Sequence, residues 1–170
     1  MIKKIWPLLL IGYFIAAMAA VLYIHHYWQE NTNAPEQPIA FSHQKHAGEL
    51  ELECTTCHQY ADKGMHATVP AMSICMSCHE DVATDKPEIQ KLTKFWNDKE
   101  PIPWVKIHDV PWHVYFSHKR HVAKGIECQT CHGEVQTMTK VRQVRSLDMG
   151  WCVSCHRQNN ASTDCLTCHK

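Results

Sequence analysis

The sequence predicts a mostly irregular fold, with short α-helices, long loops and little or no sheet, preceded by one N-terminal transmembrane helix. Three observations predict it. All ten cysteines of the 170-residue chain occur in five copies of the pattern Cys-x-x-Cys-His. Residues 5–24 form an apolar stretch without a charged side chain. The rest of the chain is too short to build an ordinary side-chain core around five such motifs, so bound groups have to supply most of the apolar volume.

The five motifs identify those bound groups. Cys-x-x-Cys-His is the attachment pattern of c-type haem, in which two thiols bind the porphyrin covalently and the adjacent imidazole ligates the iron. The sequence therefore predicts five covalently attached haem c groups. The attachment cysteines are Cys54, Cys57, Cys75, Cys78, Cys128, Cys131, Cys152, Cys155, Cys165 and Cys168. The proximal iron ligands are His58, His79, His132, His156 and His169.

Two alternatives explain the paired cysteines less well. Zinc knuckles hold their metal through such pairs, but zinc does not require a His after every second Cys. Five disulfides would suit a secreted protein, but they do not explain a two-residue gap inside every pair followed by His.

The apolar stretch predicts that residues 1–28 are a membrane anchor, because residues 5–24 are long enough to cross a bilayer core of roughly 30 Å as a helix. Lys3 and Lys4 precede the stretch, so the positive-inside rule places the N-terminus in the cytoplasm. We therefore expect a single-pass protein of the bacterial inner membrane, with its haem domain in the periplasm.

A cleaved signal peptide is the alternative to an anchor, since Ala17-Met18-Ala19 resembles a cleavage site. The apolar run continues past that site. Tyr23, Tyr27 and Trp28 follow it and resemble an interfacial aromatic belt. Both features favour a retained anchor.

The remaining chain divides into a linker and two related halves. Residues 29–38 are polar and contain Pro, which is typical of a linker. Residues 39–100 form a first half with two haem motifs, and residues 101–170 form a second half with three. The formal net charge is zero, so we expect no nucleic-acid partner.

Each half contains nearly the same hexapeptide ahead of its first motif, "FSHQKH" at 41–46 and "FSHKRH" at 116–121. Two histidines three positions apart lie on one face of a helical turn, so one turn can serve two neighbouring irons. His43 and His46, and likewise His118 and His121, are therefore candidate distal ligands. We expect the Phe ahead of each pair to pack on a porphyrin face.

This arrangement resembles the class III multihaem cytochromes, in which the element Phe-x-His-x-x-His gives its two histidines to two haems. Residues 116–170, with one such element and three attachment motifs, are similar to the three-haem members. The resemblance implies a class III cytochrome-like fold. It also implies four ligand pairs: His43 with His58, His46 with His79, His118 with His132, and His121 with His156.

A closer resemblance extends over most of the chain beyond the linker. It rests on "HATVPAMSICMSCH" (66–79), "PWVKIHDVPWHVYFSHKRHV" (103–122), "CHGEVQTMTKV" (131–141) and "LDMGWCVSCHR" (147–157). These segments resemble the membrane-anchored pentahaem subunit of alternative complex III, a quinol-oxidising respiratory assembly of bacteria. The resemblance implies partners of three kinds: polytopic membrane subunits, an iron–sulfur subunit and a monohaem cytochrome.

The four ligand pairs implied by the class III resemblance leave the haem of the fifth motif without a distal ligand. The candidates are His66, His108, Met138 and Met149. In the three-haem relatives the last haem takes its ligand from just before the middle motif, where this chain has Met149. The resemblance implies no ligand at His113. We predict one His/Met haem, with Met149 preferred over Met138. An all-His set using His66 and His108 is the alternative.

The function predicted from these features is electron transfer without catalysis. Electrons would pass from a quinol-oxidising complex to a downstream cytochrome or oxidase. One alternative is a single-helix multihaem quinol dehydrogenase that feeds a periplasmic reductase. Another is a multihaem reductase, which needs an iron with an open site. The number of His candidates for distal ligation disfavours the reductase.

Overall fold

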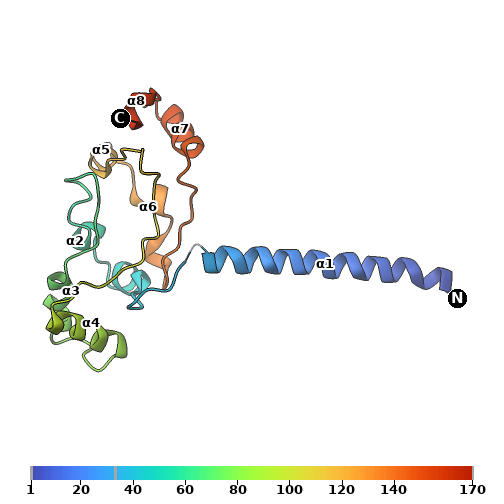
Figure 1. Ribbon diagram of the computed structural model, residues 1–170, viewed down its shortest axis with the longest axis horizontal. Coiled ribbons are helices and arrows are strands. Elements are labelled where there is room, and N and C mark those ends of the chain that lie inside the picture. Colours follow the sequence, from blue (N-terminus) through green and yellow to red (C-terminus); the bar gives the residue numbers. More distant parts are fainter. Residues whose placement is uncertain (1, 33, 170) are drawn as a thin grey trace.

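A computed structural model describes residues 2–32 and 34–169 of the chain, without the side chains of residues 2–4 and 28–32. Helices and irregular segments make up the described residues, and no strand occurs among them. The predicted fold class is therefore confirmed. A single long helix projects from a ring-shaped body of short helices and loops, which holds all five motifs (Figure 1).

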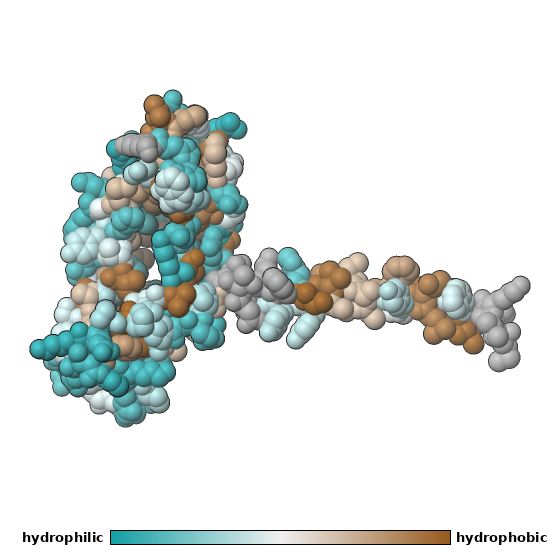
Figure 2. Space-filling model, in the orientation of Figure 1, coloured by the Kyte–Doolittle hydropathy of each residue, from teal (hydrophilic) through white to brown (hydrophobic). Residues whose placement is uncertain are grey.

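The long helix is α1 (Ile2–Thr32), which contains Pro7 near its start, where a helix tolerates it. Its segment Ile5–Tyr27 has the length and composition to cross a membrane, with a mean hydropathy of 2.3. Apolar side chains cover α1 along the length that lies clear of the body (Figure 2). The helix continues to Thr32, into the predicted linker. The predicted topology signals Lys3 and Lys4, and the belt residue Trp28, lie outside the described side chains.

Five short helices carry the attachment motifs. They are α2 (Cys54–Cys57), α3 (Met72–His79), α6 (Cys128–His132), α7 (Met149–Gln158) and α8 (Cys165–Cys168). In the shortest helices the ligand histidine closes the turn through its own backbone. The His58 N–H donates to the Cys54 carbonyl at 2.8 Å, and the His169 N–H donates to the Cys165 carbonyl at 2.9 Å. The two cysteines of a motif thus share one helical turn with the imidazole that follows.

The side-chain core is small. Only Ala34, Ile39, Met76 and Leu92 are buried hydrophobics among the described residues. The last three form one cluster where α3 packs beside α4 (Pro87–Asp98). A core of this size agrees with the expectation that bound groups fill most of the interior.

The two halves of the chain hold each other's hexapeptides. The first hexapeptide leads into η1 (Gln44–Glu49), a π-helix that packs against η2 (Val135–Thr137) of the second half. The Gln44 N–H donates to the Met138 carbonyl at 3.0 Å. The second hexapeptide leads into α5 (His118–Val122), whose His118 N–H donates to the Met65 carbonyl of the first half at 3.1 Å.

Candidate functional site

Three of the expected ligand pairs lie side by side. The ring centroids of His46 and His79 are 6.1 Å apart, and those of His121 and His156 are 6.0 Å apart. The rings of His118 and His132 are nearly parallel, with centroids 6.3 Å apart. Imidazole nitrogens bind metal ions at about 2 Å, so an iron held between two imidazoles separates their ring centroids by about 6 Å. These separations fit a haem iron.

The fourth expected pair is His43 and His58. Burial, followed by the neighbouring His58 and His46 imidazoles, lowers the pKa of His43 to about 4. His132 behaves similarly: burial comes first, and then His108 and His118 help to lower its pKa to about 4. Both imidazoles are therefore neutral near pH 7, which is the form that binds metal ions. The Nδ1 atom of His43 is buried without a hydrogen-bond partner.

Backbone carbonyls fix the tautomer of most histidines at the motifs. A carbonyl only accepts, so each Nδ1 within hydrogen-bond distance of one carries the proton and leaves Nε2 to bind metal. The distances between Nδ1 and the carbonyl oxygen run from 2.6 Å at His156 to 3.2 Å at His169. The seven pairs are His46–Ser42, His58–Thr68, His79–Val82, His118–Met65, His121–Ser117, His156–Ser162 and His169–His113.

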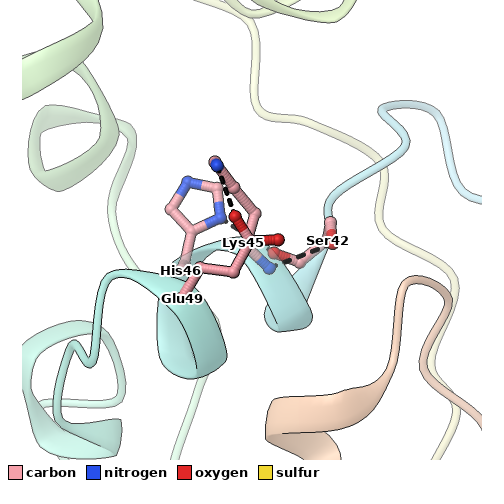
Figure 3. Close-up of polar contacts among 4 residues, drawn as sticks. All are labelled: Ser42, Lys45, His46 and Glu49. Carbon is pink, nitrogen blue, oxygen red and sulfur yellow. Dashed lines mark hydrogen bonds and ion pairs between the residues drawn. The ribbon is translucent and has the colours of Figure 1, made fainter.

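The hexapeptide orients its second histidine from two sides. In Figure 3 the His46 ring points away from η1, and its Nδ1 bonds to the Ser42 carbonyl at 2.9 Å. Phe41 stacks on the same ring, with centroids 4.4 Å apart. The stacking of Phe41 on the imidazole is compatible with a further contact to a porphyrin face, which stays a prediction. Two contacts on one ring leave little freedom for His46 to rotate.

The motifs adjoin one another in an order that differs from their order in the chain. Burial raises the pKa of the Cys75 thiol, and the neighbouring Cys57 raises it further. Burial likewise raises the pKa of the Cys128 thiol, and the neighbouring Cys54 is the next largest cause. The second motif thus adjoins the first, and the first adjoins the third.

The remaining motifs continue this line. Burial raises the pKa of Cys131, followed by the effect of Cys155 in the fourth motif. Burial and then Cys168 raise the pKa of Cys152. The order of neighbours is therefore second, first, third, fourth, fifth. This order is followed in Figure 1 from α3 through α2, α6 and α7 to α8.

The four residues considered for the fifth haem lie in different places. Met149 begins α7 with a relative exposure of 67%. Met138 lies at the junction between the halves, where its carbonyl accepts from the Gln44 N–H. The His66 side chain is exposed. The His108 ring meets the His132 ring edge-on at 4.4 Å, which leaves too little room for an iron between them. His25 and His26 lie in α1.

A residue that sequence reasoning set aside lies beside the fifth motif instead. The rings of His113 and His169 are 5.4 Å apart, with 24° between their planes. The signal that could have found it is an asymmetry between the halves. The second half has one attachment motif more than the first, and it also has histidines ahead of its hexapeptide, where residues 29–40 have none.

The residues fit covalent haem. All ten cysteines are free thiols, paired at the spacing of one helical turn. Each of the pairs His46–His79, His118–His132 and His121–His156 combines a motif histidine with one from a hexapeptide. With the exception of His132, these histidines keep Nε2 available, as the tautomers described above require. The donor set is thus two thioether positions and facing imidazoles, which suits a haem iron.

Comparison with known proteins agrees with this chemistry. The class III cytochrome c family matches residues 22–108, which is half of the chain, and the family of cytochrome c7 and related cytochromes c matches residues 114–170.

Two curated relatives come from Nitratidesulfovibrio vulgaris. One is a menaquinone reductase, multiheme cytochrome c subunit, 28% identical over 162 residues that cover 79% of this chain and 77% of that protein. The other is a high-molecular-weight cytochrome c, 26% identical over 168 residues that cover 70% of this chain but 31% of that protein. With its attachment motifs and facing histidines, the chain belongs to the class III cytochrome c family and is a multihaem c-type cytochrome of electron transport.

Proposed function

We propose that this protein is a membrane-anchored pentahaem electron-transfer subunit of a complex that exchanges electrons with the membrane quinone pool. The observation that carries the proposal is that each of the five attachment motifs adjoins the next in one line, from α3 to α8, in a body joined to one apolar helix. A line of this kind suits a conductor between two partners, because a carrier needs an entry at one end and an exit at the other.

Haem supplies the redox chemistry when it is bound, by taking up and releasing single electrons. The chain's residues do the rest. The cysteines would attach each haem, and the facing imidazoles would ligate its iron. Backbone carbonyls at Nδ1 hold most of these rings in place, which limits the reorganisation that accompanies electron transfer. Two imidazoles on an iron leave no position for a substrate, which supports a carrier rather than a reductase.

The anchor and the haem domain define the proposed topology. The apolar helix α1 spans the inner membrane with Lys3 and Lys4 in the cytoplasm, and the haem domain faces the periplasm. Partners are then the polytopic membrane subunits, the iron–sulfur subunit and the monohaem cytochrome of an alternative complex III-like assembly. Electrons enter from quinol oxidation and leave to a cytochrome or oxidase.

The reverse direction is a second candidate, which the relative in the menaquinone reductase favours. In that case the haems receive electrons from a periplasmic donor and deliver them to menaquinone through membrane partners. Both candidates keep the same pentahaem carrier and differ in the direction of net flow.

One set of experiments tests the proposal and separates the two directions. The complex is purified gently from membranes, its subunits are identified by mass spectrometry, and the haem masses on this chain are counted. Five haem masses and a co-purifying polytopic membrane subunit are expected. Haem reduction by a menaquinol analogue, blocked by a quinone-site inhibitor, supports the oxidising direction. Analogue reduction by pre-reduced haems supports the other direction. Fewer than five haems on mature protein, or a chain that purifies without any membrane partner, contradicts the proposal.

A further inference from the structure

The fifth motif has a facing histidine that the hexapeptides do not supply. The His113 ring lies beside the His169 ring at 5.4 Å between centroids, with 24° between the planes. This arrangement resembles the His118–His132 pair, whose rings are also close to parallel at 6.3 Å. The separation is slightly below the value of about 6 Å that an iron between two imidazoles requires, and it is larger than the 4.4 Å between His108 and His132.

Backbone contacts tie the His113 segment to the fifth motif. The Tyr115 N–H donates to the Cys168 carbonyl at 2.8 Å. The His113 carbonyl accepts from Nδ1 of His169 at 3.2 Å, which leaves Nε2 of His169 for metal. A turn closed by the Val114 N–H on the Pro111 carbonyl precedes these contacts, and Trp112 packs edge-on against the His113 ring. The placement of His113 is therefore set by several independent contacts.

The other candidates are engaged elsewhere or point away. Met149 is largely exposed at the start of α7, and the Met138 backbone belongs to the junction with η1. His108 packs against His132, at the third motif. Each hexapeptide histidine already faces, or in the case of His43 neighbours, another motif histidine.

We infer that His113 is the distal ligand of the haem attached at Cys165 and Cys168, so that all five haems have two histidine ligands. This inference rests on the proposed pentahaem function. It replaces Met149 and Met138 as the predicted source of the fifth ligand. It also means that no haem gains the higher potential that a thioether ligand confers.

The test uses the full-length protein matured with its haems, in three states: unaltered, His113→Ala and His113→Met. The unaltered ferric protein is expected to be entirely low-spin, without the charge-transfer band at the red end of the visible spectrum that marks a Met ligand. His113→Ala should convert one haem of the five to high-spin, seen by electron paramagnetic resonance, and that haem should bind added imidazole. His113→Met should introduce the red band and raise the highest reduction potential.

The matched controls are His66→Ala, which removes an exposed histidine, together with Met149→Leu and Met138→Leu. All three should leave the spin state and the red end of the spectrum unchanged. The inference is overturned if His113→Ala remains wholly low-spin, if the unaltered protein shows the Met band, or if a control variant creates the high-spin haem. The haem count by mass is read separately for every sample. Fewer than five haems on the unaltered protein would contradict the proposed function. Five haems on His113→Ala, all of them still low-spin, would contradict this inference alone.

Discussion

Phe41 stacks on the imidazole of His46 with ring centroids 4.4 Å apart and 21° between the planes. Phe116 repeats this contact on His121 at 4.5 Å and 24°. In both hexapeptides the Ser carbonyl four residues earlier holds Nδ1 of the same histidine. The repeated sequence therefore encodes a repeated orientation of the second histidine ring, in addition to the pair of histidines that we propose as ligands.

Replacing Phe41 by Leu should free the His46 ring to rotate. The expected result is a changed electron paramagnetic resonance signal for the haem at His79, with the other haems unaffected, and a loss of about 1 kcal/mol of unfolding free energy from the aromatic contact. Tyr60→Leu, at an exposed aromatic position, serves as the control. An unchanged spectrum in Phe41→Leu would show that the stacking has no role in ligand orientation.

The junction between the halves is closely packed at Gly48. A Cβ there would clash with the Gln136 carbonyl oxygen. The carbonyl oxygen belongs to the backbone of η2, and a Cβ is attached directly to the backbone of η1, so neither atom can turn aside. Gly48→Ala should therefore force η1 away from η2 and destabilise the protein by roughly 1–3 kcal/mol. Thermal unfolding followed at the haem absorption measures the loss.

Gly150 in α7 is the matched control, since nothing lies within 4 Å of an added Cβ. Gly150→Ala should stabilise its helix by up to about 1 kcal/mol. Equal stability of the two alanine variants would contradict close packing at the junction.

The sequence was informative wherever the chemistry is local. The attachment cysteines and proximal histidines are predicted from a pentapeptide, and the distal role of the hexapeptide histidines is predicted from the spacing of two residues on one turn. The interlocked halves were not predicted, because they depend on backbone bonds such as Gln44 to Met138. His113 was missed for the same reason, since it lies 56 positions from His169 and a long loop brings the two together.

Arg145 should tune the haem of the third motif. Its positive charge favours the thiolate of Cys131 and so works against the effect of burial on that pKa. A positive charge near a haem disfavours the oxidised iron, so Arg145→Gln should lower the potential of that haem. A change of roughly 1 kcal/mol, or about 40 mV, is expected for a partly screened charge.

Redox titration followed by absorption measures this shift. Lys94→Gln is a suitable control, because Lys94 is exposed in α4 and pairs with Asp98. Removing it should leave the third haem unchanged, since exposed charges are screened by salt. A rise in potential in Arg145→Gln would contradict the proposed sign.

The order of the motifs predicts which haem is indispensable for conduction. The third motif adjoins the first and the fourth, through Cys54–Cys128 and Cys131–Cys155, whereas the second motif stands at one end. A variant without the third haem, with both of its cysteines replaced by alanine, should therefore divide the line into two parts. A variant without the second haem should keep the other four connected.

A photoreductant attached at Ala161→Cys, in the exposed turn between α7 and α8, injects electrons near the fifth haem of each variant. In the unaltered line and in the variant without the second haem, electrons should spread rapidly to the first haem, as followed by flash absorption spectroscopy. Without the third haem they should remain on the fourth and fifth haems, because the gap breaks the only sequence of adjoining motifs described above. Rapid reduction of the first haem in that variant would mean that electrons take a route other than second, first, third, fourth, fifth.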